Sequence, residues 1–166
     1  MSYNEVELYG RKIRVYSENH IEMEMRGKKE NWQIKPCSMH KEYKRFYFNS
    51  NGKQRNILLH RLIFYSRNPS WDIYDTSKDN SIDHQNGDPS DNSIENLRCV
   101  THQENGFNRT TAKGYYLDKR NNKWQAKIKL NGKDISLGMY AKETDARDAY
   151  LEAKSKYHII KERVFD

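Results

Sequence analysis

The clearest alternation of hydrophobic and polar positions in this chain lies in its C-terminal third. One face of this segment carries four hydrophobic residues at alternate positions: Trp124, Ala126, Ile128 and Leu130. Such alternation is typical of a β-strand with one buried face. The Asn131-Gly132 pair that follows favours a tight turn into a second strand over 134–140. A short strand at 115–117 precedes them, so we predict three antiparallel strands.

A helical period replaces the alternation after Lys142. Small or aromatic residues recur there at helical spacing: Ala146, Ala149, Tyr150, Ala153 and Tyr157. Their size would let a helix lie close against one face of the sheet. The opposite, lysine-rich face would then remain open.

Upstream, residues 44–49 and 55–59 flank a turn at 50–53 and predict a hairpin. Residues 58–69 follow as a helix, whose apolar face carries Leu59, Leu62, Ile63 and Tyr65. In the first forty residues we expect strands at 6–8, 13–16 and 20–26. Their pattern indicates no function.

The segment 83–105 reads as strand, loop, strand and helix. Hydrophobic residues lead into Asp83 and His84, and a turn-rich loop follows at 87–91. After the second strand, Thr101 and Glu104 match a capping box, which predicts a helix that opens at His102. Asn105 would lie in its first turn, and the polar ends of all three elements could converge.

The side chains in this segment suit metal-assisted cleavage of a phosphodiester. Asp83 and Asn105 offer the oxygen ligands that Mg²⁺ and Mn²⁺ accept. His84 can take a proton from water near neutral pH. Asp, Asn and Gly are also ordinary turn residues, and an Asp-His pair is often only a surface hydrogen bond. The ordered set is the stronger signal.

This segment carries three motifs in order: DH, N-G-x-x-x-D-N and ENLR-x-VT-x-x-EN. On these motifs it resembles the HNH endonuclease family, in the form found in phage and intron homing endonucleases. The resemblance implies a ββα-metal unit in which Asp83 and Asn105 hold one divalent ion and His84 activates water. Asn96 would brace the loop and orient the base.

Asn105 stands where the family name implies a second histidine, which favours Mg²⁺ or Mn²⁺ over zinc. His102 could be a substitute ligand or a DNA contact, although a plain exposed helix position is favoured. His60 is better explained by packing or capping than by chemistry.

GYY…KWQAKI…SLGMY…DARDAY is similar to the ethylene-response-factor type of DNA-binding domain of plants, whose sheet enters the major groove. This implies DNA contacts from six residues of the C-terminal domain: Tyr116, Arg120, Lys123, Gln125, Lys127 and Lys129. In related homing nucleases a hairpin beside the catalytic unit also contacts DNA. This adds five backbone contacts: Lys41, Lys44, Arg45, Lys53 and Arg55. A solvated lysine face without a partner is the alternative.

Composition agrees with a polyanionic partner, because 30 Lys and Arg against 23 Asp and Glu give a net charge of +7. Cys37 and Cys99 are far apart and lack CxxC spacing, so we expect free thiols and no structural zinc. No apolar run long enough to span a membrane and no signal-peptide core is visible, so we expect the cytoplasm, that of the host if a phage encodes the chain.

Together these observations predict an α+β protein. We expect an N-terminal extension and HNH nuclease domain over 1–108 with its catalytic core at 58–108, a linker at 109–113 and a DNA-binding domain at 114–166. The predicted function is a metal-dependent, site-favouring homing endonuclease of bacteriophage type that nicks or cuts double-stranded DNA. One active site per chain permits action as a monomer. The alternatives are a DNA-binding regulator with an inactive HNH unit and a non-specific or defensive nuclease.

Overall fold

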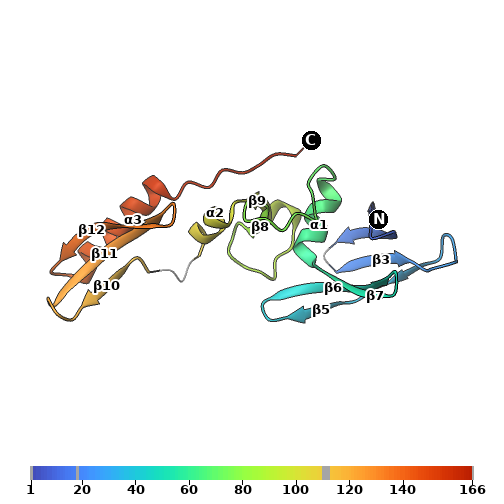
Figure 1. Cartoon of the computed structure of the whole chain (residues 1–166), viewed down its shortest axis with the longest axis horizontal. Helices are drawn as coiled ribbons and strands as arrows, with labels where there is room; N and C mark the ends of the chain where they lie inside the picture. The colour runs from blue at the N-terminus through green and yellow to red at the C-terminus, as the bar shows by residue number, and fades with distance from the viewer. Residues whose placement is uncertain (1, 18, 110–112, 166) are drawn as a thin grey trace. The chain divides into compact units, whose positions relative to one another are not determined.

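The computed structural model describes residues 2–17, 19–109 and 113–165, and these form a mixed α+β fold (Figure 1). The expected fold class is confirmed at this level. The described residues divide by their contacts into two compact units. The first unit comprises Met1–Val100 and Glu162–Asp166, and the second unit comprises Thr101–Lys161.

The first unit begins with two antiparallel sheets. The first contains β1 (Asn4–Leu8), β2 (Arg11–Ser17), β3 (His20–Glu24) and β4 (Trp32–Ile34), in that order. The second contains β5 (Cys37–His40), β6 (Tyr43–Ser50) and β7 (Lys53–Leu58). The sequence predicted β1, β2 and β3 and the β6–β7 hairpin, whereas it missed the short strands β4 and β5.

Helix α1 (Leu59–Arg67) follows β7 directly and is the centre of the first core. Leu59 and Leu62 are fully buried, together with Phe46 of β6 and Ile13 of β2. Arg61 does not face solvent along its whole length, because its guanidinium donates to the backbone oxygens of Ile73, Asp75 and Asn80 at 2.9–3.0 Å. It therefore holds the loop that leads to the next hairpin.

That hairpin consists of β8 (Ser81–His84) and β9 (Leu97–Val100), which pair antiparallel. A 3₁₀ turn, η1 (Ile94–Asn96), precedes β9. The chain then continues into α2 (His102–Phe107), which belongs to the second unit. The order of elements is that of a ββα unit, and the packing of α2 against the hairpin stays a prediction.

The second unit contains β10 (Tyr115–Asp118), β11 (Lys123–Leu130), β12 (Lys133–Tyr140) and α3 (Glu143–Tyr157). The strands pair in chain order, and α3 lies along one face of their sheet (Figure 1). Ile128, Tyr150 and Ala153 form its core. Gly114 admits no larger residue, since an added Cβ would lie 2.1 Å from the Tyr150 ring.

One position of the predicted helical stripe is wrong. Ala146, Tyr150 and Ala153 are buried, but Tyr157 is 41% exposed. It is the last residue of α3, and Lys156 Nζ lies 5.2 Å from the centre of its ring. The helix therefore ends where the periodicity alone would have extended its buried face.

The last described residues of the chain return to the first unit. Arg163 forms a β-bridge with Cys99 of β9, and the Phe165 ring meets Phe64 of α1 edge-on at 5.9 Å. The sequence assigned these residues to the C-terminal domain and placed a linker at 109–113. Residues 110–112 of that linker lie outside the described residues. The contacts within the chain instead place the two boundaries between the units after Val100 and before Glu162.

Candidate functional site

The β8–β9 hairpin places the acid and the base at the end of one short strand. Asp83 and His84 are the last two residues of β8, and they pair with Arg98 and Leu97 of β9. Their exposed fractions are 5% and 6%. Buried polar groups are retained only when they have partners, so the contacts of these two side chains define the site.

Arg98 holds the Asp83 carboxylate. Its Nε and Nη2 both donate to Asp83 Oδ2, at 3.0 and 2.8 Å. The two residues face each other across the β8–β9 pair, so backbone register sets this contact. A charge-assisted contact through two nitrogens fixes the orientation of the carboxylate as well as its charge. The sequence identified Asp83 but gave Arg98 no role.

Asn96 braces the loop between the two strands. Its Oδ1 accepts from the backbone N–H of Asn86 at 2.9 Å. Its Nδ2 donates to Asn86 Oδ1 at 3.0 Å and to the backbone oxygen of Asp91 at 2.8 Å. These bonds close the loop in the way the resemblance implied for Asn96. The predicted second role, orientation of His84, has a different candidate in the structure.

That candidate is Asn92, which the sequence reasoning passed over. Its side chain is 2% exposed, and its Oδ1 lies 3.2 Å from His84 Nε2. Asn92 is the last residue of the N-G-x-x-x-D-N motif, so the motif itself contained the signal. Only the fold shows that this asparagine reaches back to the base.

Two further rings lie beside His84. His60 of α1 meets the His84 ring edge-on at 5.1 Å, and the Tyr43 ring of β6 lies 5.4 Å from His60 and 6.2 Å from His84. Burial, together with the charges of His84 and Arg61, lowers the pKa of His60 to about 3. His60 is therefore a neutral packing residue near neutral pH, in agreement with the expectation from sequence.

Two carboxylates of the loop, Asp88 and Asp91, also interact electrostatically with the base. The hydroxyl and backbone N–H of Ser93 lower the pKa of Asp91, and those of Ser90 lower the pKa of Asp88. Asp88 is exposed and Asp91 is half-buried, and both carboxyls are ionised at neutral pH. The loop therefore adds negative charge near His84, which favours a cation over an unaccompanied phosphate.

Asn105 lies in the second unit, on α2. The predicted capping box is confirmed: Thr101 Oγ1 accepts from the Glu104 backbone N–H at 3.1 Å, and Glu104 Oε2 accepts from the Thr101 N–H at 2.8 Å. The helix begins at His102 as predicted, with Asn105 as its fourth residue. His102 is exposed. The pairing of Asn105 with Asp83 on one metal ion stays a prediction.

Within the described parts of the chain, no three or more His, Cys, Asp or Glu side chains gather as a metal-binding group. An aspartate and an asparagine would not form such a group. Of the two predicted metal ligands, Asp83 belongs to the first unit and Asn105 to the second. The buried carboxylate of Asp83 is a hard oxygen donor, which suits Mg²⁺ or Mn²⁺.

The predicted DNA-binding face of the second unit is present as a face. Lys123, Gln125, Lys127 and Lys129 alternate with the buried positions of β11. Tyr116 lies opposite Gln125 in the register, and its hydroxyl donates to Gln125 Oε1. Lys127 is paired with Asp134 of β12 at 2.9 Å. Arg120 is exposed in the turn after β10.

Net charge differs sharply between the units. The second unit contains 13 Lys and Arg and 7 Asp and Glu, which gives +6. The first unit contains 17 and 16, which gives +1. Nearly all of the excess positive charge of the chain therefore belongs to the second unit.

The contacts predicted for the β6–β7 hairpin do not share one face. Lys44, Lys53 and Arg55 lie on the side of Phe46 and Phe48, whereas Arg45 lies on the other. The Arg55 guanidinium stacks over Tyr9 at 4.5 Å. Arg45 Nη1 donates to Asn56 Oδ1 at 2.8 Å. Lys41 is exposed in the turn between β5 and β6.

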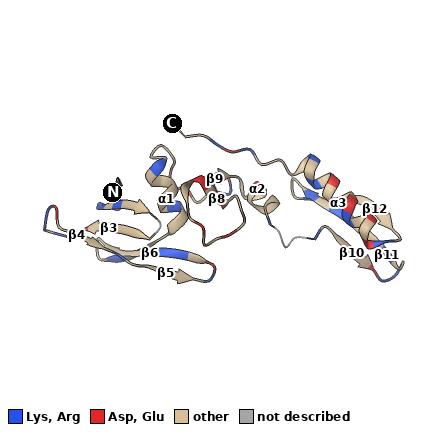
Figure 2. Ribbon diagram, turned by 180° about the vertical axis from the view of Figure 1, so that it is seen from behind, with Lys and Arg blue, Asp and Glu red and all other residues tan. Residues whose placement is uncertain are grey.

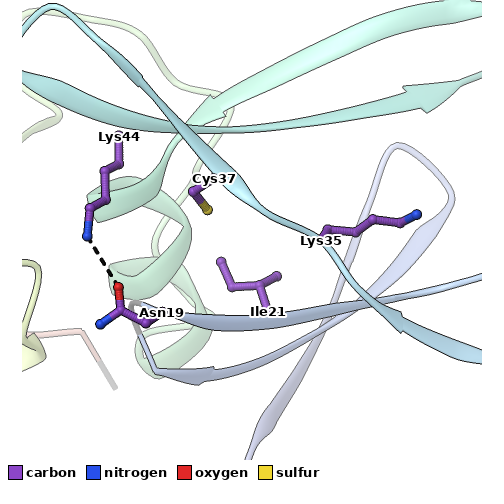
Figure 3. Close-up of a pocket in the computed structure, with 5 residues that line it drawn as sticks. All are labelled: Asn19, Ile21, Lys35, Cys37 and Lys44. Atoms are coloured by element: carbon purple, nitrogen blue, oxygen red, sulfur yellow. Dashed lines mark hydrogen bonds between the residues drawn. The ribbon is translucent and has the colours of Figure 1, made fainter.

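Lys44 belongs to a cavity of about 160 Å³ lined by Asn19, Ile21, Lys35, Cys37 and Lys44. Figure 3 shows its ammonium directed at Asn19, to whose Oδ1 it donates at 3.3 Å. Burial raises the pKa of the Cys37 thiol to about 11, which makes it a poor nucleophile. None of the predicted catalytic residues is among these lining residues.

Residues 58–107 match the model of the HNH endonuclease family. This segment contains α1, the β8–β9 hairpin and α2, and it spans 50 of the 166 residues. The match supports a nuclease hydrolase in general and DNA as its substrate. A search of curated proteins and a search of solved structures each gave no significant match. No described helix is long and apolar enough to cross a membrane.

Proposed function

We propose that this protein is a metal-dependent endonuclease that hydrolyses phosphodiester bonds of double-stranded DNA. The observation that carries the proposal is the buried Asp83-His84 pair at the end of β8, inside the segment that matches the HNH endonuclease family. Each member of the pair has a dedicated partner, Arg98 for Asp83 and Asn92 for His84. Held polar pairs of this kind are typical of catalytic sites.

His84 is the general base of the proposed reaction, and it takes a proton from the attacking water. Asp83 and Asn105 would hold one Mg²⁺ or Mn²⁺ ion. Such an ion, when bound, stabilises negative charge on the phosphate and the leaving oxygen. Asn96 keeps the loop closed, and Arg98 keeps the Asp83 carboxylate in one orientation.

The second unit supplies affinity in this proposal. Its excess of positive charge suits the phosphate backbone, and its lysine-rich sheet face has the shape of a reader that lies in the major groove. Figure 2 shows both signs of charge along α3. The strand pattern of β11 places Lys123, Lys127 and Lys129 on one face of the sheet. Lysines would neutralise phosphates, and Gln125 and Arg120 would reach base edges.

The deciding experiment measures cleavage of supercoiled and genomic DNA by the wild type, His84→Ala and His20→Ala, with Mg²⁺, with Mn²⁺ and with EDTA. We expect metal-dependent cutting that His84→Ala lowers by about 10²-fold or more, with DNA binding nearly unchanged. His20 is a histidine of β3 with no part in the site, so its variant should cut normally. Equal loss of binding and cutting in His84→Ala would contradict a role as base.

Mapped cut positions on genomic DNA separate the remaining alternatives. A few discrete sites would support a site-favouring homing endonuclease of phage type that acts in the host cytoplasm. Scattered cuts would support a non-specific or defensive nuclease, because a basic domain can raise affinity without choosing a sequence. Binding without cutting under any metal condition would support a regulator with an inactive HNH unit.

A further inference from the structure

The amide of Asn92 is bonded at both ends, which determines the direction in which it points. Its Nδ2 donates to the backbone oxygen of Ser90 at 3.1 Å. The oxygen end is therefore the end that faces His84, where Oδ1 lies 3.2 Å from Nε2. An amide oxygen can only accept a hydrogen bond, so the ring nitrogen opposite it must be the one that carries a proton.

We infer that Asn92 fixes the tautomer of His84, with the ring proton on Nε2 and the proton-accepting lone pair on Nδ1. The inference rests on the proposed function, because it names the atom of the base that receives the proton of the attacking water. Asn92 acts through His84 and is a positioning residue. The arrangement follows the general logic in which a third group holds a catalytic imidazole in one tautomer.

The surroundings make this orientation rigid. Asn92 is almost fully buried, so rotating its amide would break both bonds away from water. The His60 ring at 5.1 Å and the Tyr43 ring at 6.2 Å lie beside the imidazole and limit its rotation about the side-chain bond. Nδ1 and Nε2 therefore cannot exchange places by a ring flip without displacing these neighbours.

The assignment gives a balanced proton path. The water oxygen bonds to phosphorus, one water proton passes to Nδ1, and His84 becomes an imidazolium. The bond from phosphorus to the leaving oxygen breaks, and its electron pair stays on that oxygen, which takes a proton from solvent. The imidazolium then returns its extra proton to solvent. Through all of these steps the Nε2 proton stays on the bond to Asn92.

Nitrogen NMR of the full chain labelled with ¹⁵N-histidine tests the assignment without metal or DNA. In the wild type we expect a His84 proton attached to Nε2 that exchanges slowly with water. Asn92→Asp keeps an acceptor oxygen but lacks the donor to Ser90, and it should keep this signal. Asn92→Ala lacks both groups and should lose the signal to exchange. Asn56→Ala, which removes an exposed asparagine of β7, should leave it unchanged.

Two outcomes would overturn the inference. One is a wild-type His84 whose ring proton resides on Nδ1. The other is loss of the signal in Asn92→Asp as well as Asn92→Ala, which would mean that Asn92 acts only by bracing the loop through Ser90. Thermal unfolding of both variants identifies any loss of fold directly.

Cleavage separates this inference from the proposed function. We expect Asn92→Ala to cut about 10- to 100-fold more slowly at unchanged DNA affinity. A wild type that cuts no DNA, yet carries the Nε2 proton, would overturn the proposed function and leave the tautomer assigned. A wild type that cuts while its His84 carries the proton on Nδ1 would support the proposed function and overturn the tautomer assignment.

Discussion

The two units differ in how they hold the residues on which their proposed functions depend. In the first unit Asp83, His84, Asn92 and Asn96 are all buried, and each has a side-chain or backbone partner at hydrogen-bond distance. In the second unit the lysines and Arg120 lie on an accessible strand face or turn, on which Lys127 makes one exposed ion pair. Chemistry requires side chains fixed before the substrate arrives, whereas attraction of a polyanion requires only charge of the correct sign.

The energetic consequence is that single substitutions should act very differently in the two units. Removing one partner of a buried charged pair leaves an uncompensated charge, while exposed ion pairs contribute little. We therefore expect the largest effects on stability from the first unit and graded effects on DNA affinity from the second.

The largest effect should follow from Arg98→Met, which keeps the aliphatic stem and removes the charge beside Asp83. We expect the first unit to lose about 3–5 kcal/mol of unfolding free energy, measured by denaturant melts of the whole chain. The double variant with Asp83→Asn should recover part of that loss. Strictly additive losses in the two single variants would show that the contact at 2.8 Å does not couple them.

A smaller effect on stability should depend on pH. The folded-state pKa of His60 is lowered to about 3 from its usual 6.5, so below pH 6.5 the unfolded chain binds a proton that the folded chain does not. The free energy of unfolding that depends on a neutral, buried His60 is fully present above pH 6.5 and is lost as the pH falls toward 3. The loss amounts to about 2 kcal/mol between pH 6.5 and 5.

His60→Gln removes the titrating group and should flatten that part of the pH profile. The measurement is the unfolding free energy of both proteins at a series of pH values. The charged or titratable neighbours of His60 include His84, Arg61 and Tyr43, and all three are present in each protein. Parallel pH profiles for the wild type and His60→Gln would contradict the burial of a neutral imidazole.

The sequence predicted the local structure of both regions well where one segment decides it. The capping box at Thr101 and Glu104, the strand pattern of β11 and the β6–β7 hairpin all depend on neighbours within a few residues. Asp83 and Asn96 were found because a motif of fixed spacing contains them. The predicted place of Tyr157 in the buried stripe was wrong because periodicity does not indicate where a helix ends.

Contacts between distant segments were not predictable in the same way. Arg98 meets Asp83 only through strand register, and Tyr43 meets His84 only because β6 and β8 pack around α1. The return of Arg163 and Phe165 to the first unit depends on a chain path that no local pattern encodes. The sequence thus indicated the reacting groups, and the fold identified the residues that position them.

In the second unit, joint neutralisation of the lysine face should weaken DNA binding without affecting the fold. For Lys127→Gln with Lys129→Gln we expect affinity to fall roughly 10-fold and the slope of log affinity against log salt to become shallower by about 2. The matched control neutralises Lys142 and Lys156, which belong to α3 or its start. An equal loss of affinity in that control would mean that net charge alone explains the effect. It would contradict the proposal that the sheet face binds DNA.

The smallest expected effect is a gain in DNA affinity. Asp134 pairs with Lys127 at 2.9 Å, and the lysine lowers the pKa of this carboxyl, so a negative charge stands on the proposed DNA face at neutral pH. Asp134→Asn keeps the shape and removes the charge, so DNA affinity should rise about 2- to 5-fold at moderate salt. Asp148→Asn makes the same charge change on α3, against the other face of the sheet, and should raise affinity less. If both variants gained equally, or Asp134→Asn gained nothing, β11 and β12 would not face the phosphates, and the second unit would have to bind through another surface.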